Sequence, residues 1–274
     1  MSAKVTVVGS LNFDVLLGMD ALPVIGETRI ARSAATAGGG KGANQAVQAA
    51  KLGAETAMVG AVGKDAIGAS LVSDLQEYGV DTSRILRKDA PTGLGIVSYL
   101  EDGSLSATIS RGANFELTPN DINRAGDLID DSDVVLFQLE NPIETVIAGI
   151  HRAREADVFV VLNGAPAAEV DSKTLALVDS FVVNEVEAAF YLGFAEPLSE
   201  QEARSVGPSL LAQVGRSVVI TLGPEGALLF EKDGVTSIPA EAVVPVETTG
   251  AGDSFIGAMS VLSAEGKPIA EACR

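Results

Sequence analysis

Short, continuous apolar runs alternate along this chain with segments whose apolar residues recur at helical spacing. A fully apolar run of about five residues is typical of a strand that is buried on both faces of a parallel sheet. The predicted strands are residues 5–9, 56–62, 134–139, 158–163, 181–183 and 218–222. The predicted helices are residues 43–52, 66–78, 143–156, 186–192 and 202–213. This alternation predicts an α/β fold, a doubly wound and mostly parallel sheet with helices on both faces.

Two segments depart from the alternation, because they contain extended patterns and turns without a helix between them. They cover residues 12–36, with a turn at 23–26, and residues 91–111, with a turn at 102–103. We interpret them as strands of a small separate β-sheet. A length of 274 residues suits a single domain, so we assign residues 1–274 to one unit.

Composition restricts the core and the partners. Aromatic residues make up 4% of the chain and Trp is absent, so the core consists mainly of Val, Leu, Ile and Ala. The formal net charge of −18 disfavours a nucleic-acid partner, whose phosphates would be repelled. It does not exclude a nucleotide bound as a magnesium complex in a local electropositive loop.

Cysteine, histidine and apolar runs exclude several further classes. Cys273 is the single cysteine and His151 the single histidine, so neither an intrachain disulfide nor a zinc cluster is expected. No apolar run approaches the roughly 20 residues that span a bilayer, and the first residues carry no signal-peptide pattern. We therefore expect a cytoplasmic protein without a membrane partner.

The most informative segment is residues 247–255, with the sequence ETTGAGDSF. It lies between a predicted strand at 242–246 and a predicted helix at 254–264. Gly250 and Gly252 allow successive backbone N–H groups to point at one anion, and a helix N-terminus adds positive charge. Asp253 then lies where it could deprotonate a substrate hydroxyl. The alternative is an ordinary glycine turn with Asp253 as the helix N-cap.

A second glycine-rich segment, residues 38–46, has the sequence GGGKGANQA just before a predicted helix. Its glycines permit close approach of the backbone, and Lys41 and Asn44 can donate hydrogen bonds. It is not a phosphate-binding loop of the Walker A type, because no Lys-Ser or Lys-Thr pair follows the glycines. It is not a dinucleotide fingerprint either, so a Rossmann oxidoreductase is disfavoured.

Polar residues also follow the predicted strands, where ligands bind in doubly wound sheets. Asn12 and Asp14 come after the first strand and Glu140 after the third, and the alternative for each is an ordinary polar loop. Asn184 and Glu187 have the spacing of a helix capping box, which is an alternative to a ligand site. The segment 221–226, TLGPEG, ends a predicted strand in a turn bounded by glycines, which we interpret as a tight turn between two strands.

The two glycine-rich motifs together resemble the signatures of the PfkB-type sugar kinases, the family that includes the ribokinases. The segment TTGAGD at 248–253 is similar to the C-terminal signature, and GGKGANQA at 39–46 is similar to the N-terminal signature in its ribokinase form. The resemblance implies ATP-dependent phosphorylation of the primary hydroxyl of D-ribose. In this reading Asp253 is the general base, and the backbone at Gly250, Ala251 and Gly252 forms an anion hole.

The resemblance also implies ligands for each substrate. On the sugar side they are Asn12, Asp14, Gly40, Lys41, Gly42, Ala43, Asn44, Glu140 and Asp253. On the ATP side they are Asn184, Glu187, Thr221, Leu222, Gly223, Pro224, Glu225, Gly226 and Gly252. Glu187 is expected to hold Mg²⁺ through water, and Glu247 and Thr249 to ligate an activating K⁺. The small sheet is expected to be a lid over the sugar and the contact of a homodimer.

The chain departs from the family pattern in three places. Glu247 stands where an Asp is usual, which puts K⁺ dependence in question, and Gly164 replaces a proline. The sequence stops at Arg274, inside an expected helix, so the family's C-terminal helices with their adenine loop and further cation ligands are missing. We expect a truncated form with weakened ATP binding.

Two alternatives to a ribose kinase remain. One is a PfkB-type kinase that acts on deoxyribose, a nucleoside or a ketose. The other is a sugar-binding protein with weak catalysis, which lacks the adenine and cation elements.

Overall fold

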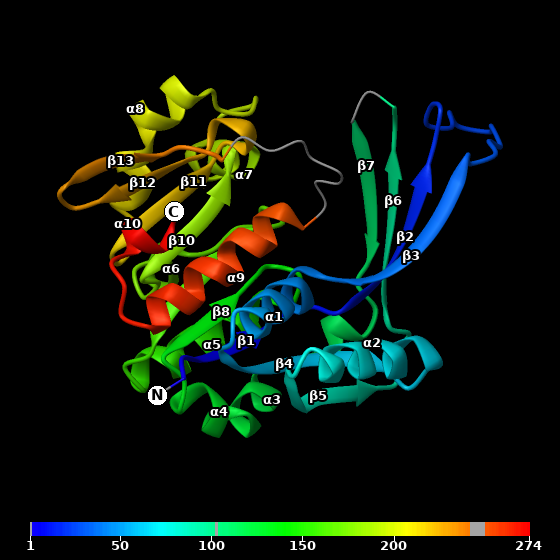
Figure 1. The fold of residues 1–274 in the computed structure, drawn as a ribbon, viewed down its shortest axis with the longest axis horizontal. Helices are drawn as coiled ribbons and strands as arrows, with labels where there is room; N and C mark the ends of the chain where they lie inside the picture. The colour runs from blue at the N-terminus through cyan, green and yellow to red at the C-terminus, as the bar shows by residue number, and fades with distance from the viewer. Residues whose placement is uncertain (1, 102–103, 242–249) are drawn as a thin grey trace.

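The molecule is built on a central sheet of nine strands (Figure 1). The computed structural model describes residues 2–101, 104–241 and 250–274. From one edge to the other the strands are β13 (Gly234–Ile238), β12 (Ala227–Glu231), β11 (Ser217–Thr221), β10 (Ser180–Asn184), β9 (Phe159–Asn163), β8 (Val134–Phe137), β1 (Lys4–Val8), β4 (Glu55–Gly63) and β5 (Asp81–Lys88). Neighbours from β11 to β5 pair in parallel, and β12 and β13 pair antiparallel. The doubly wound, mostly parallel sheet predicted from the sequence is confirmed.

Helices cover both faces of this sheet and separate the core into two layers. One face carries α1 (Lys41–Lys51), α2 (Ala66–Glu77), α9 (Ala251–Ala264) and α10 (Ile269–Ala272). The other carries α3 (Pro119–Arg124), α4 (Gly126–Asp130), α5 (Ile143–Glu155), α6 (Ser172–Leu175), α7 (Glu185–Leu192) and α8 (Glu200–Leu211). Alternate residues of each strand point into opposite layers, so Val135 and Phe137 pack with one set of helices and Val134 and Leu136 with the other. None of the helices in the described part of the chain is long and apolar enough to cross a membrane.

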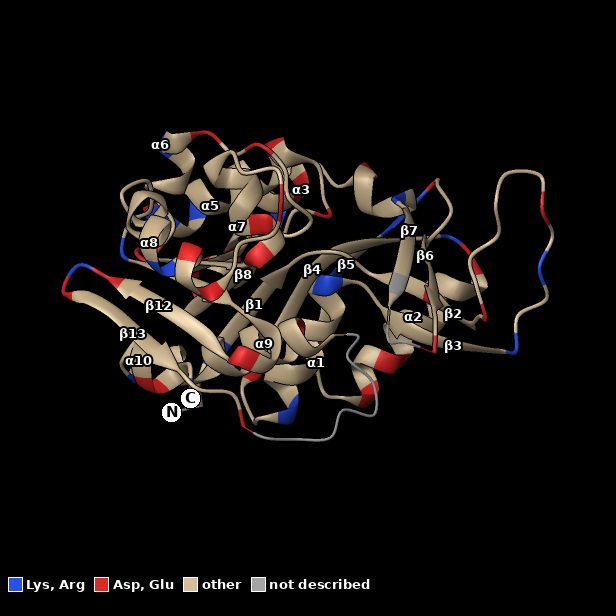
Figure 2. Ribbon diagram, turned by 90° about the horizontal axis from the view of Figure 1, so that it is seen from above, with Lys and Arg blue, Asp and Glu red and all other residues tan. Residues whose placement is uncertain are grey.

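A second sheet of four strands is set off to one side of the main sheet (Figures 1 and 2). Its strands, in order, are β3 (Ser33–Gly39), β2 (Asn12–Gly18), β6 (Gly93–Tyr99) and β7 (Leu105–Ser110). The separate sheet predicted within residues 12–36 and 91–111 is therefore present, and β3 continues three residues beyond the predicted segment. We call this sheet the lid. Short 3₁₀ turns lie at Gly112–Glu116, after β7, and at Gly223–Glu225, between β11 and β12.

Three strands of the main sheet were missed in the sequence. The edge strand β5 reads DTSRILRK, and its residues are half-buried or exposed, so it lacks the apolar run of an inner strand. Strands β12 and β13 form a hairpin whose register pairs Ala227 with Ile238. The antiparallel pairing of β11 with β12 confirms the interpretation of residues 221–226 as a tight turn between two strands.

Candidate functional site

The site is organised by the first turn of α9, which begins at Ala251 rather than at the predicted residue 254. Gly250 is the N-cap and has a left-handed backbone with a φ of 76°, a conformation that favours glycine. Asp253 is the third helical residue and is 8% exposed, so the interpretation of Asp253 as the N-cap is wrong. Because the first N–H groups of a helix have no acceptor within it, those of Ala251 and Gly252 are available to an anion.

Two side chains of α1 hold the Asp253 carboxylate. Asn44 Nδ2 donates to Asp253 Oδ2 at 3.0 Å, and Gln45 Nε2 donates to Asp253 Oδ1 at 3.0 Å. The two helices approach closely at Gly257, where an added Cβ would lie 2.8 Å from Gln48 Cβ and 2.9 Å from Gln45 O. The structure thus joins the two glycine-rich motifs through hydrogen bonds, although about 200 residues separate them along the chain.

The start of α1 packs tightly on the connection between β1 and β2. Gly40 has a φ of 91°, and a Cβ there would lie 2.8 Å from Ser10 O and from Asn12 N. A Cβ on Gly42 would lie 2.6 Å from Ser10 N. Ala43 N donates to Ser10 O at 3.0 Å. The predicted close backbone approach at these glycines is therefore confirmed, and it places the start of α1 against the base of the lid.

Asp14 occupies a slot between two lid glycines. An added Cβ would lie 2.0 Å from Asp14 Oδ2 at Gly39 and 2.2 Å from Asp14 Oδ1 at Gly95. Burial raises the pKa of the Asp14 carboxyl above its ordinary value, and the negative charges of Glu140 and Asp253 raise it further. The three carboxylates thus converge on one region.

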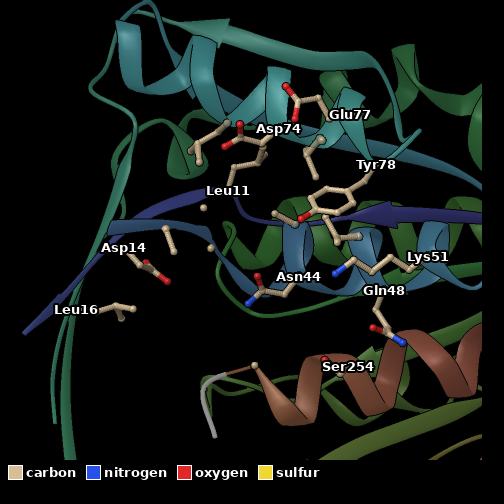
Figure 3. Close-up of a pocket in the computed structure, with 18 residues that line it drawn as sticks. Leu11, Asp14, Leu16, Asn44, Gln48, Lys51, Asp74, Glu77, Tyr78 and Ser254 are labelled. Atoms are coloured by element: carbon tan, nitrogen blue, oxygen red, sulfur yellow. The ribbon is translucent and has the colours of Figure 1, made fainter. Parts of the chain in front are cut away.

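A cavity of about 480 Å³ opens beside this region, between the lid, α1, α2 and α9 (Figure 3). Asp14, Ala43, Asn44 and Gly250 line it, and the close-up shows Asp14 extending from the lid and Asn44 from α1. The other predicted sugar ligands lie outside its lining. These are Asn12, Gly40 and Gly42, which are buried; Glu140, which is 8% exposed; and Lys41 and Asp253, which line a second cavity.

The second cavity, of about 190 Å³, lies on the other side of the start of α9. Its lining includes Lys41, Asn163, Asn184, Glu187, Thr221 and residues 250–253. Gly250 lines both cavities. Lys41 was predicted to bind the sugar, but it lies beside residues that were predicted to bind ATP. The start of α9 lies between the two cavities.

Asn184 and Glu187 form the capping box of α7. Asn184 N donates to Glu187 Oε2 at 2.9 Å, and Glu187 N donates to Asn184 Oδ1 at 2.8 Å. The capping interpretation is confirmed, whereas the role of Glu187 toward Mg²⁺ stays a prediction. Burial raises the pKa of the Glu187 carboxyl, with smaller lowering contributions from the Asn184 N–H and the Lys41 charge.

The turn after β11 contributes some of its predicted residues to a third cavity, of about 300 Å³. Thr221, Gly223 and Gly226 line it together with Gly252 and Phe255 of α9. Leu222 instead packs in the apolar core, and Pro224 and Glu225 are exposed on the turn outside the lining. The remaining predicted residues, Glu247 and Thr249, and the predicted strand at 242–246 lie outside the described residues.

Three side chains that hydrogen-bond to the predicted residues or the backbone beside them were not identified as site residues from the sequence. Asn114 Oδ1 accepts from Leu11 N at 2.9 Å, and its Nδ2 donates to Leu11 O at 3.0 Å and to Asn12 Oδ1 at 2.8 Å. It thus fixes the point where β1 leads into the lid. Ser10 Oγ donates to Glu140 Oε2, which also accepts from Lys41 N at 3.1 Å. Gln45, the third, directly follows Asn44 in its motif, which was the available signal.

The chain is similar to known proteins over nearly its whole length. The family model described as "pfkB family carbohydrate kinase" matches residues 2–274. The ribokinase of Bacillus subtilis (strain 168) is 37% identical over 272 residues, which cover 99% of this chain and 89% of that protein. The deoxyribokinase of Salmonella typhi is 33% identical over 255 residues, which cover 92% of this chain and 83% of that protein. The structure of Arabidopsis thaliana ribokinase complexed with ribose and ATP matches with a TM-score of 0.87 at 30% identity, covering 100% of this chain and 89% of that chain. With the family match extending over the whole described fold, the chain belongs to the pfkB family of carbohydrate kinases and is a phosphotransferase.

Proposed function

We propose that this protein transfers the γ-phosphate of ATP to the primary hydroxyl of D-ribose, giving ribose 5-phosphate. The observation that carries the proposal is the location of Asp253 in the first turn of α9. That turn has the lid-side cavity with Asp14 and Asn44 on one side and the cavity with Asn184 and Glu187 on the other. A sugar hydroxyl and a phosphate brought in from the two sides would meet beside one carboxylate. The ribokinase relatives favour ribose as the acceptor.

In this mechanism Asp253 accepts the proton of the attacking hydroxyl. The N–H groups at the start of α9 face the developing negative charge of the phosphoryl group, as is usual in phosphoryl transfer. The amino group of Lys41 supplies positive charge in the same cavity. Asp14, held between Gly39 and Gly95, would accept hydrogen bonds from the ribose hydroxyls.

Mg²⁺ fits the second cavity by its donor set. The carboxylates of Glu187 and Asp253 and the side chain of Asn184 line one hollow, and Mg²⁺ prefers oxygen ligands and retains several waters. Glu187 would hold the ion through water. When bound with ATP, the ion offsets the negative charge of the phosphates. Besides this, the cap that Glu187 makes to Asn184 N fixes the direction of its side chain.

The first test is ADP release by the purified chain with D-ribose, ATP, Mg²⁺ and K⁺, beside Asp253→Asn. A general base contributes roughly 10²–10⁴-fold, so the variant is expected to lose nearly all turnover while it folds and binds ribose. A variant that kept more than about a tenth of the parental kcat would rule out a general base at this position. A protein that folds and binds ribose but releases no ADP would instead support the sugar-binding alternative.

The closest alternative acceptor is deoxyribose, because the Salmonella deoxyribokinase is nearly as similar as the ribokinases. A nucleoside or a ketose is a further possibility within the family. Values of kcat/KM for D-ribose, 2-deoxy-D-ribose, adenosine and D-fructose under one set of conditions separate these acceptors. A higher value for any of the last three would replace ribose in the proposal.

Two further parts of the proposal concern K⁺ and the lid. Exchange of K⁺ for Na⁺ at constant ionic strength is expected to lower kcat, and an unchanged kcat would indicate that Glu247 does not support a K⁺ site. Ile96, Tyr99 and Ile109 of the lid expose 41–45% of their surfaces, which supports the lid as a homodimer contact. Light scattering that gave a monomer at assay concentration would contradict the dimer.

A further inference from the structure

A chain of buried amide side chains extends from Asp253 into the core. Gln45 Nε2 donates to Asp253 Oδ1 at 3.0 Å and to Asn163 Oδ1 at 3.3 Å. Gln138 Nε2 donates to Gln45 Oε1 at 2.7 Å. Gln45 and Gln138 have no exposed surface, and Asn163 is 5% exposed. The carboxylate of Asp253, which lines the second cavity, is therefore linked to Asn163 of β9 and to Gln138, which directly follows β8.

The chemistry of the groups fixes the direction of this chain. An ionised carboxylate only accepts hydrogen bonds, so the Gln45 atom that faces Asp253 has to be the amide nitrogen. Gln45 Oε1 then points at Gln138 and requires a donor there. Asn163 Nδ2 donates to Val182 O at 3.1 Å, which leaves Asn163 Oδ1 to accept from Gln45. None of the three amide groups can be flipped without placing two acceptors or two donors in contact.

This series of amide side chains ends at Gln138, whose oxygen atom contributes no hydrogen bond among the described residues. Gln138 Oε1 is buried and has no hydrogen-bond partner within the described part of the chain. It packs against Gly9, where an added Cβ would lie 2.1 Å from Gln138 Oε1. An apolar side chain of the same shape at 138 would avoid that unpaired oxygen, whose burial is unfavourable. The stability of the core alone therefore does not account for the amide of Gln138.

We propose that Gln45 is a positioning residue for the general base, and that Gln138 acts through Gln45 by fixing the orientation of its amide. Gln45 anchors the buried oxygen, Oδ1, so that the other oxygen, Oδ2, remains directed toward the acceptor hydroxyl beside Asn44. An amide N–H cannot take up the transferred proton, so the proton remains on the carboxyl group. This inference rests on the proposed role of Asp253 as the base.

The test uses apolar replacements of similar length. Gln45→Met removes the donor to Asp253, and Gln138→Met removes the donor that orients the Gln45 amide. The double variant removes both amides, so that Gln138 is not left without its Gln45 partner. Ser260→Ala is the control, because it removes a buried hydrogen bond from the same helix, α9, two turns beyond Asp253. Thermal unfolding of each variant separates loss of fold from loss of turnover.

Misplacement of a reacting group by about 1 Å can cost on the order of 10²-fold in rate. We therefore expect Gln45→Met to lower kcat by roughly 10- to 100-fold, with KM for the acceptor and for ATP changed less than about threefold. Gln138→Met should lower kcat by a smaller factor. The double variant should be no worse than Gln45→Met, because residues acting in series are not additive. Ser260→Ala should stay within about twofold of the parent.

Three results would overturn the inference. They are a kcat within about twofold of the parent in the folded Gln45→Met or double variant, a loss confined to KM, and an equal loss in Ser260→Ala. A crystal structure of Gln45→Met gives an answer that does not depend on activity: Asp253 should turn away from its contact with Asn44, and an unmoved carboxylate would contradict positioning.

Failure of the proposed function gives a different result. If ribose is not the acceptor, the same series is measured with the acceptor that the parent phosphorylates best. If Asp253→Asn keeps its turnover, the base assignment itself is wrong, and the inference about Gln45 is overturned with it.

Discussion

The substitution Gly95→Ala tests whether the lid glycines set the affinity for the acceptor sugar. Asp14 on β2 pairs with Gly95 on β6, and an alanine Cβ would lie 2.2 Å from Asp14 Oδ1 and 3.1 Å from Asp14 Cγ. Such contacts are hardly ever shorter than 3.0 Å, so the oxygen has to move by about 1 Å. It cannot move away toward β3, because the backbone of Gly39 closes the other side of the slot. The carboxylate therefore has to rotate out of its place.

The size of the effect follows from the hydrogen bonds that the rotation removes. Hydrogen bonds to a charged group contribute about 1.5–3 kcal/mol, which corresponds to a roughly 10- to 150-fold change in affinity. We expect KM for the sugar to rise by about this factor, with KM for ATP and kcat changed less than about threefold. The assay is coupled ADP release with the sugar varied at saturating ATP.

Gly38→Ala is the matched control. It lies on β3 next to Gly39, and its Cβ would meet Leu71 Cδ2 at 3.3 Å and Asp74 Oδ2 at 3.7 Å, which small side-chain shifts can accommodate. The reasoning is refuted if Gly95→Ala leaves KM for the sugar unchanged, or if Gly38→Ala raises it as much. A loss of kcat alone would also refute it, because the slot would then not act through sugar binding.

Three further predictions concern charge, the cap and the core. Burial and neighbouring carboxylates raise the pKa of Asp14, so its ionised form destabilises the folded state. Asp14→Asn should therefore have a larger free energy of unfolding than the parent in urea at pH 7. This gain should vanish as the pH falls below 3.8, where the parent carboxyl is protonated in both the folded and the unfolded state. Glu187→Gln keeps an oxygen for the Asn184 N–H, so its melting temperature should match that of the parent while Mg²⁺-dependent turnover falls. A fall in melting temperature that accounts for the whole loss of turnover would show that Glu187 acts only as a helix cap. Phe137→Ala removes a fully buried ring that packs on Gly149 and should lower the free energy of unfolding by about 3–5 kcal/mol in urea titration, and a loss below about 1 kcal/mol would contradict its place in the core.

The class of fold and the motif at the start of α9 could be predicted from the amino-acid pattern. Inner parallel strands are buried on both faces, so their apolar runs are continuous and were located to within a few residues. An edge strand needs no such run, which is why β5 was missed. The start of α9 was placed three residues late, because Gly250 and Gly252 read as a loop and the backbone of Gly252 is helical in the structure. The motif residues Asn44 and Asp253 were identified because their neighbours repeat a known pattern.

The contacts between these residues could not be predicted in the same way, because they join segments far apart in the chain. Gln45 and Asp253 are 208 residues apart in sequence, Gln45 and Gln138 are 93 apart, and Asn114 and Leu11 are 103 apart. A local pattern shows which face of a helix is apolar, but it carries no information on the register between distant elements. The packing of α1 on α9 sets the hydrogen bonds around Asp253. The pairing of β2 with β3 and β6 sets the slot that holds Asp14, because the glycines that leave room for it belong to strands far apart in the chain.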